Sequence, residues 1–326
     1  MTEHPESNLV TVDDAAADFA ADVRAGLGHD GQKTLSPKYL YDALGSALFE
    51  AITQLPEYGL WRAEGRLLHA HAEDIARSTE AANLIELGSG SANKTAHLVR
   101  SLLRRHPVSY ATVDLSPSAL EMTRRELGAL RGVNLRSIEG DYLSGLELAV
   151  RSRPAGRPIL VLFLGSSLGN FDYTTSRTFL RRIRRVLQPG DSLLLGADLQ
   201  KPLAQMVAAY DDALGVTAAF NLNLLVRMNR ELGADFQLPQ FVHRARFNAL
   251  THDVEMHIES RCDQRVQIPG ARLQIGFAAG ETIHTESSHK YSLEELDSLT
   301  QNAAFRCTAQ WVDADWRFMS ALYQAL

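Results

Sequence analysis

Short apolar runs alternate with helical patterns between Asn83 and Asp198, and this alternation is the strongest constraint on the fold. The runs predict strands buried on both faces, at Asn83–Leu87, Ser109–Asp114, Asn134–Glu139, Pro158–Leu164 and Ser192–Asp198. The helical patterns cover Asn93–Arg105, Pro117–Arg131 and Tyr173–Leu187. Strands that alternate with helices form a parallel sheet covered on both faces. We therefore predict an α/β protein with a Rossmann-like, doubly covered sheet.

The segments on either side of this region have a different pattern. Helices are predicted before it, at Val10–Leu27, Pro37–Leu55 and Arg62–Ser78. After it come a helix, a hairpin, one or two strands, a polar stretch, a helix and two final strands, at Leu203–Leu214, Val242–Cys262, Arg265–Phe277, Gly280–Lys290, Ser292–Gln301 and Phe305–Leu326. At roughly 150 residues per domain, 326 residues suggest two domains. We expect a sheet domain interrupted by the other domain.

Composition excludes several functional classes. The chain has 33 basic and 39 acidic residues, a net charge of −6, whereas a general nucleic-acid binder carries a basic surplus. Its two cysteines cannot form a disulfide framework or a four-thiolate zinc site, and no metal is expected. No apolar run approaches the ~20 residues of a membrane span, and the start lacks a signal-peptide pattern. We expect a cytoplasmic protein with no nucleic-acid or membrane partner.

A glycine loop follows the first predicted strand. Gly88 and Gly90 lie between this strand and a helix, where glycine permits a sharp turn and unpaired amides face a ligand. Asp114 and Asp141 end the next two strands, where carboxylates can meet the ribose hydroxyls and the adenine amine of a nucleotide-like cofactor. The third glycine of a dinucleotide site is missing, and Lys94 lacks Walker spacing. NAD binding, or a plain strand–helix turn with two unrelated capping acids, remains an alternative.

Asn170 ends the block that follows the fourth strand. Ligands of open α/β sheets bind at the carboxyl ends of the strands, which places Asn170 near the reacting group. Its amide offers both a donor and an acceptor to an amino acid. The alternative role is that of a turn residue after Gly169.

An ordered series of motifs carries a resemblance to a known family. The motifs are Leu55–Tyr58, Glu86–Gly90, Phe163–Asn170, Tyr210–Asn221, Asn229–Leu232 and Thr285–Glu286. From about residue 20 to the end, the chain resembles the histidine-specific Nα-methyltransferases of ergothioneine biosynthesis. The resemblance implies a class I methyltransferase domain at 63–199 and 290–326 and a second α+β substrate-binding domain at 8–62 and 200–289. The residues at 1–7 are expected to form a flexible tail. It also implies S-adenosyl-L-methionine as cofactor, and we expect a monomer.

The resemblance assigns the site residue by residue. The positions expected to surround an amino-acid substrate are Tyr58, Asn170, Tyr210, Met256, Glu286 and Ser288. Glu286 and Ser288 would each hold one imidazole nitrogen, and Asn170 and Tyr210 the α-carboxylate and amino end. Tyr41 and Asn170 would orient the amine and serve as the catalytic pair. The positions expected to contact the cofactor are Tyr41, Glu86, Gly88, Gly90, Lys94, Asp114, Asp141, Tyr142 and Gly165.

The predicted function is methyl transfer to the α-amine of L-histidine, three times, to give hercynine. Trp61 departs from the family pattern near the expected pocket entrance, which leaves open an indole or other amino acid as substrate. A non-catalytic binder of S-adenosylmethionine is the third possibility. Without the resemblance, Tyr58 would be a helix-end cover, Met256 a core residue, and Glu286 a solvated acid in a polar stretch.

Overall fold

The computed structural model describes residues 12–79, 81–153 and 156–326, with side chains from residue 17 onward. The tail expected at residues 1–7 lies outside this range. The chain divides into two compact units, each built from separate segments. Unit 1 takes in residues 1–40, 218–244 and 256–286, and unit 2 takes in residues 41–217, 245–255 and 287–326. The domain boundaries expected from the sequence stay a prediction.

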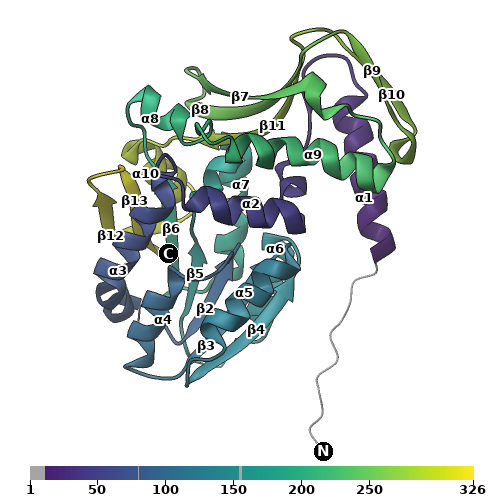
Figure 1. Cartoon of the computed structure of the whole chain (residues 1–326). Coiled ribbons are helices and arrows are strands. Elements are labelled where there is room, and N and C mark those ends of the chain that lie inside the picture. Colours follow the sequence, from purple (N-terminus) through teal and green to yellow (C-terminus); the bar gives the residue numbers. More distant parts are fainter. Residues whose placement is uncertain (1–11, 80, 154–155) are drawn as a thin grey trace, which may run out of the picture. The chain divides into compact units, whose positions relative to one another are not determined.

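Unit 2 contains a seven-stranded sheet (Figure 1). Its strands are β2 (Asn83–Leu87), β3 (Val108–Asp114), β4 (Val133–Glu139), β5 (Ile159–Phe163), β6 (Ser192–Asp198), β12 (Phe305–Asp313) and β13 (Phe318–Ala325). The order is β12-β13-β6-β5-β2-β3-β4. Neighbouring strands among β2, β3, β4, β5 and β6 are parallel, whereas β13 is antiparallel to both of its neighbours, β6 and β12. The Rossmann-like α/β class is confirmed, as are the five predicted strands and the final pair.

β5 shows why these runs form central strands. Ile159, Val161 and Phe163 pack into the core on one face of the sheet. Leu160, Leu162 and Leu164 pack into the core on the other face. Successive side chains of a strand point to opposite faces, so a continuous apolar run suits only a strand that is covered on both.

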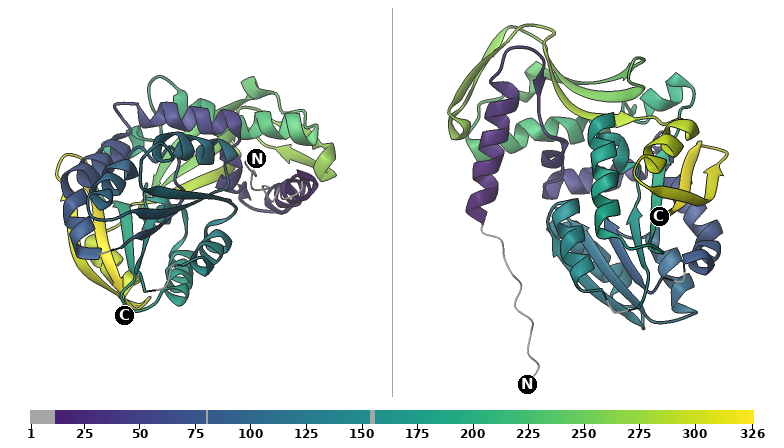
Figure 2. Two further views of the ribbon diagram at one scale, coloured as in Figure 1. Left: turned by 90° about the horizontal axis from the view of Figure 1, so that it is seen from below. Right: turned by 180° about the vertical axis from the view of Figure 1, so that it is seen from behind.

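Helices supply the two covers (Figure 2). Helices α3 (Gly59–Thr79), α4 (Thr95–Leu103) and α5 (Pro117–Leu127) contribute apolar side chains to one core. Helices α6 (Tyr142–Arg151), α7 (Tyr173–Val186) and α10 (Leu293–Gln301) contribute them to the other. Sequence analysis missed α6, which follows β4 after a short turn and begins where the side chain of Asp141 caps it. Ser292 caps the start of α10, because its hydroxyl accepts the backbone N–H of Glu295.

Two predicted helices are divided differently in the structure. The helix expected over 37–55 is a 3₁₀ turn, η1 (Pro37–Leu40), followed by α2 (Ala43–Thr53). The break arises because the carboxylate of Asp42 accepts the backbone N–H of Gly45 and starts a new helix. The helix expected over 203–214 ends early, as α8 (Leu203–Ala208), and the missed α9 (Val216–Leu232) follows it. Asp212 accepts the amides of Val216 and Thr217 at 2.9 and 2.7 Å, which starts α9.

The remaining strands form two smaller sheets. A four-stranded sheet has the order β1-β11-β8-β7, from β1 (Lys33–Thr34), β11 (Thr282–His289), β8 (Asp253–Ser260) and β7 (Phe241–Asn248). Strands β9 (Gln264–Ile268) and β10 (Leu273–Phe277) form an antiparallel pair, and the other elements are α1 (Val12–Leu27), η2 (Ser167–Asn170), η3 (Leu238–Gln240) and η4 (Pro269–Ala271). The predicted hairpin is confirmed, whereas the segment read as a polar stretch is strand β11. Unit 2 includes the end of β7 and the beginning of β8, and residues 287–289 of β11.

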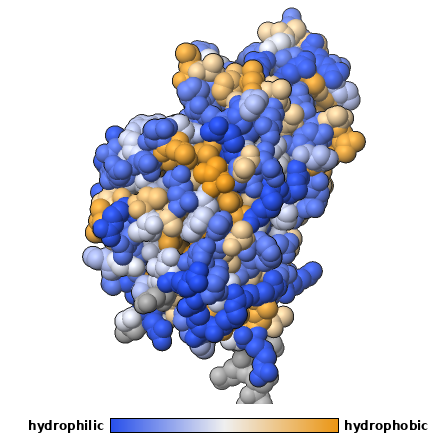
Figure 3. Space-filling model, turned by 90° about the vertical axis from the view of Figure 1, so that its left-hand side faces the viewer, coloured by the Kyte–Doolittle hydropathy of each residue, from blue (hydrophilic) through white to orange (hydrophobic). Residues whose placement is uncertain are grey.

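The surface shown in Figure 3 is mainly hydrophilic, with apolar residues in small groups between polar ones. Among the described residues, no helix has the length and apolarity needed to cross a bilayer.

Candidate functional site

The centre of the seven-stranded sheet contains a topological switch point. β2 pairs in parallel with both β3 and β5, so the chain leaves β2 toward one edge of the sheet and later returns to build the other. Ligands of open α/β sheets bind outside the carboxyl ends of strands at such a point. Here those ends lead into Gly88 after β2 and Leu164-Gly165 after β5.

The glycine loop after β2 needs the backbone freedom of glycine. Gly88 has φ +75° and Gly90 has φ +50°, both in the left-handed region. A β-carbon on Gly88 would lie 3.2 Å from the ring of Tyr142, whereas one on Gly90 would meet no atom within 4 Å. Gly88 is thus packed against Tyr142, and Gly90 borders open space. The structure brings together these three residues of the predicted cofactor set.

Asp114 lies beside the loop at the end of β3. Its carboxylate accepts the amide of Ser116 at 2.9 Å and that of Gly90 at 3.3 Å. Burial raises the pKa of Asp114, and the hydrogen bonds from these amides oppose the rise. The carboxylate is therefore held in one orientation next to Gly90, as a nucleotide-like ligand would require.

Asp141 follows β4 and is exposed. One carboxylate oxygen accepts the amides of Leu143 and Ser144, each at 3.0 Å. Burial works in the opposite direction, but the hydrogen bonds from the amides of Ser144 and Leu143 prevail and lower the pKa of Asp141. Asp141 is an ionised helix cap with its second oxygen available to bond elsewhere.

Glu86 lies inside the protein rather than on the loop surface. Its side chain is 2 % exposed. Its carboxylate accepts the hydroxyl of Thr95 at 2.6 Å and also that of Tyr110. Burial raises its pKa to about 7. These contacts tie β2 to α4 and β3 beneath the glycine loop; a direct cofactor contact by Glu86 stays a prediction.

A buried acid that sequence analysis missed joins two of the predicted cofactor residues. Glu64 on α3 is fully buried, and its two oxygens accept the amide of Gly165 at 2.8 and 3.0 Å. Lys94 forms an ion pair with the same carboxylate. A signal was present in the sequence, because Glu64 lies in the apolar stripe that includes Leu60, Leu67 and Leu68. Lys94 therefore neutralises the acid that supports the loop after β5.

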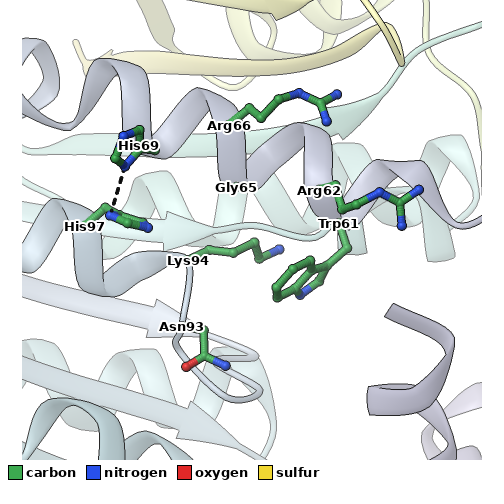
Figure 4. Close-up of a pocket in the computed structure, with 8 residues that line it drawn as sticks. All are labelled: Trp61, Arg62, Gly65, Arg66, His69, Asn93, Lys94 and His97. Atoms are coloured by element: carbon green, nitrogen blue, oxygen red, sulfur yellow. Dashed lines mark hydrogen bonds between the residues drawn. The ribbon is translucent and has the colours of Figure 1, made fainter. Parts of the chain in front are cut away.

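Trp61 and Lys94 line a pocket of about 470 Å³ between α3 and α4 (Figure 4). The Lys94 ammonium lies 5.7 Å from the centre of the Trp61 ring. On the other side of this pocket, the Nδ1 atoms of His69 and His97 are 3.3 Å apart. Lys94 belongs to both this pocket and the predicted cofactor set. The structure places Trp61 against Lys94.

A row of aromatic rings includes three of the predicted site residues. Edge-to-face contacts run from Tyr41 to Phe49 at 5.5 Å, from Phe49 to Tyr58 at 6.1 Å, and from Tyr58 to Tyr210 at 6.1 Å between ring centres. Tyr58 and Tyr210 are each 7 % exposed. The structure thus brings Tyr41, Tyr58 and Tyr210 into one continuous aromatic row, with Phe49 as a member that sequence analysis missed.

A hydrogen-bond triangle continues this row. The Tyr210 hydroxyl donates to the Ser288 hydroxyl at 2.7 Å. The ammonium of Lys290 donates to Tyr210 at 2.8 Å and to Ser288 at 2.9 Å. Lys290 is 0 % exposed and was not predicted as a site residue. Its contact with Tyr210 joins residues that are 80 positions apart in the chain, which sequence spacing does not indicate.

Lys290 also belongs to a buried group of charges at the carboxyl end of β6. Asp198 accepts from Lys290 at 3.0 Å, from the Trp316 indole at 3.1 Å, and forms an ion pair with Lys201. Burial lowers the pKa of Lys201 to about 8, and the negative charge of Asp198 opposes this. Two buried ammonium groups thus share one buried carboxylate.

Asn170 lies at the end of η2, which is packed against the end of β11. A β-carbon on Gly169 would be 2.9 Å from the carbonyl oxygen of His289. This close approach brings the turn that carries Asn170 beside the strand end that carries Ser288. Ser166, which precedes η2, has a left-handed φ of +60°, and its hydroxyl accepts the amide of Asp198 at 2.9 Å.

Met256 and Glu286 belong to unit 1, on the adjacent strands β8 and β11. The Thr285 hydroxyl donates to the backbone carbonyl of Met256 at 2.9 Å, which joins the two strands at this level. Met256 is 1 % and Glu286 is 7 % exposed, so Glu286 is a buried carboxylate and not a solvated one.

Comparison with known proteins gives matches over nearly the whole chain. A family model described as a SAM-dependent, histidine-specific methyltransferase matches residues 19–325. The histidine N-alpha-methyltransferase of Mycolicibacterium smegmatis is 40 % identical over 313 residues, which are 94 % of this chain and 95 % of that protein. That of Mycobacterium tuberculosis is 38 % identical over 294 residues, 90 % of each chain. Ergothioneine biosynthesis protein 1 of Neurospora crassa is 31 % identical over 299 residues, 86 % of this chain but 32 % of that protein.

Proposed function

The chain belongs to the histidine-specific, S-adenosylmethionine-dependent methyltransferase family, and we propose that it transfers methyl groups from S-adenosylmethionine to the α-amine of L-histidine. Three successive transfers would give hercynine. The observation that carries the proposal is the 40 % identity to a histidine N-alpha-methyltransferase across 94 % of the chain. The geometry of unit 2 supports it.

The residues at the switch point fit the cofactor. Gly90 borders open space where any side chain would intrude, and Asp114 presents a fixed carboxylate beside it, suited to the two ribose hydroxyls. Asp141, exposed after the next strand, is suited to the adenine amine. Gly88, Tyr142 and Gly165 would form the walls around the ligand. When bound, S-adenosylmethionine supplies a methyl group on a positively charged sulfur.

The protein's task is to present a neutral amine in line with that methyl group. A chain-terminal α-amine has a pKa of ~8 and that of a free amino acid is higher, so the proton of the substrate amine must leave before attack. A nearby positive charge favours the neutral amine, and no strong general base is required. We assign orientation of the amine to Tyr41 and Asn170. Positioning and exclusion of water then supply most of the acceleration.

Recognition of histidine is assigned to polar groups on β11 and to the aromatic row. Glu286 and Ser288 are two residues apart on this strand, so their side chains leave the same face of it. A carboxylate can accept the imidazole N–H, and a hydroxyl can bond the second nitrogen. Tyr58 and Met256 would form the walls of the substrate site, and Tyr210 would meet the amino end of the substrate.

The proposal is tested by incubating the purified protein with S-adenosylmethionine and a panel of amino acids, and measuring product masses. Histidine that gains one, two and three methyl groups is the expected result. A methylated tryptophan or other amino acid in place of histidine would contradict the substrate assignment. Binding of S-adenosylmethionine without any methylated product would identify a non-catalytic binder.

A further inference from the structure

All three hydrogen-bond donors of the Lys290 ammonium are used within the protein. An ammonium group has three donors and no acceptor. The structure uses all three, toward Tyr210 at 2.8 Å, Ser288 at 2.9 Å and Asp198 at 3.0 Å. Lys290 is fully buried, and a ligand would find no donor left on it. Any effect of Lys290 on a ligand must therefore pass through the residues that it contacts.

The hydrogen-bonding role that the Ser288 hydroxyl can take toward a ligand follows from this triangle. A serine hydroxyl has two lone pairs and one hydrogen. Ser288 accepts from Lys290 and from Tyr210, which occupies both lone pairs. Within the described part of the chain, no acceptor receives the hydrogen of Ser288. Ser288 can therefore act toward a ligand only as a donor, although an isolated serine could either donate or accept.

We propose that Lys290 is a positioning residue that fixes Ser288 as a donor, so that the site selects the neutral, singly protonated imidazole of histidine. This rests on the proposed function. An ionised Glu286 accepts a hydrogen bond and Ser288 donates one, and neutral imidazole offers one N–H and one bare nitrogen. Imidazolium has two N–H groups and no acceptor, and an indole has a single N–H. Either ring would leave the hydrogen of Ser288 without a partner.

The surrounding charges keep this arrangement in place. Asp198 pairs with Lys290 and with Lys201, and the positive charge of Arg317 acts on Lys201. The neighbouring His289 points away from the triangle, to Asp253 at 2.8 Å and Glu295 at 2.9 Å. The carboxylate of Glu64 packs against Gly196 of β6, the strand that ends with Asp198. The carboxylate of Asp198 pairs with the Lys290 ammonium at 3.0 Å, and an ammonium group can only donate hydrogen bonds.

The experiment compares histidine with triazolylalanine, whose ring keeps an N–H and a bare nitrogen but is protonated only in strong acid. The readout is the ratio of kcat/KM for histidine to kcat/KM for the analogue, which cancels the shared titration of the amine. For the wild type, this ratio should fall roughly ten-fold from pH 7.5 to pH 5.5, because the imidazole pKa is near 6.5. A ratio that stays constant would overturn the inference.

Lys290→Met removes the donor that orients Ser288. We expect a higher KM for histidine, an unchanged Kd for S-adenosylmethionine, and a ratio that falls less than three-fold over the same pH range. Lys201→Met is the matched control, because it removes an equally buried ammonium from Asp198 without touching Tyr210 or Ser288. The control should keep the ten-fold fall. Equal pH dependence in the two variants would overturn the role of Lys290.

A second variant serves if Lys290→Met does not fold. Ser288→Ala removes the donor itself and should flatten the ratio in the same way, whereas a retained ten-fold fall would contradict the inference. Where both single variants fold, the double variant should add no further change, because Lys290 acts through Ser288. A wild type that neither binds nor methylates histidine overturns the proposed function as well. A wild type that methylates histidine with no dependence on ring protonation overturns this inference alone.

Discussion

The carboxylate of Glu64, on α3, accepts the backbone N–H of Gly165, at the end of β5, with distances of 2.8 and 3.0 Å to its two oxygens. The Glu64 carboxylate is fully buried, and Lys94 pairs with it. The acid therefore joins a helix, the glycine loop region and the β5 loop, all within unit 2. Its removal should disturb the cofactor site without a direct contact to the cofactor.

We expect Glu64→Ala to lower the free energy of unfolding by about 2–4 kcal/mol, because it leaves the Lys94 ammonium and the Gly165 amide without a partner. The affinity for S-adenosylmethionine should fall at least ten-fold, measured by titration calorimetry. Glu73→Gln is the control, since Glu73 lies on the same helix but forms exposed ion pairs with Arg104 and Arg105. If both variants behave alike, Glu64 does not support the site.

Gly88→Ala should weaken binding of S-adenosylmethionine by roughly ten-fold, because a β-carbon would crowd Tyr142 at 3.2 Å and the backbone is left-handed. Gly190→Ala introduces the same kind of backbone strain, at φ +96°, in a turn where no atom lies within 4 Å of the new carbon. It should cost about 1 kcal/mol of stability and leave the Kd unchanged. A loss of affinity in both would point to a general effect of destabilisation.

Glu286→Ala should reduce kcat/KM for histidine by roughly 30- to 150-fold, the equivalent of about 2–3 kcal/mol, while the Kd for S-adenosylmethionine stays within two-fold of wild type. The reason is the lost acceptor for the imidazole N–H. Glu281→Ala, just before β11, removes an acid that pairs with Lys33 and should leave kcat/KM unchanged. Equal loss of histidine turnover and cofactor affinity in Glu286→Ala would contradict the assigned role.

His289 should make stability depend on pH in the alkaline range. Burial disfavours its charged form, but hydrogen bonds to Asp253 and Glu295 prevail and raise its pKa to about 9. Because the folded pKa exceeds the unfolded value of ~6.5, the stabilisation is complete below pH ~6.5 and is lost as the pH rises through 9. His289→Gln should therefore cost about 2 kcal/mol at pH 6 and much less at pH 10, measured by urea unfolding. A constant difference across this range would exclude the titration of His289 as its cause.

The central strands could be predicted because their chemistry is unambiguous. Every residue of β5 is apolar and buried, and that pattern allows few other structures. The sequence predicts a polar stretch in place of β11, because Thr285, Glu286 and Ser288 are polar although they are buried in the structure. A hydrophobic pattern cannot reveal a strand whose inward positions carry polar groups. The resemblance to a family nevertheless singled out Glu286 and Ser288.

Sequence reasoning missed the partners that hold the site in place. Lys290 meets Tyr210 and Asp198 only through the tertiary fold, whereas Lys201 pairs with Asp198 from three residues further along the chain. A lysine in a sequence is expected at the surface, since burial of an ammonium is costly unless it is paired. The pairing partner is distant in the chain for Tyr210 and Lys290, so spacing gave no indication of it.

The antiparallel strand β13 lies between β6 and β12, although it is the last strand of the sheet along the chain. During synthesis on the ribosome, β6 therefore leaves the exit tunnel more than 100 residues before the partner that covers its edge. Until then β6 offers an unpaired edge to other chains, a recognised route to aggregation. Expression should thus be unusually sensitive to truncations or stop codons that remove β13, and a nascent chain would benefit from a chaperone until that strand is made.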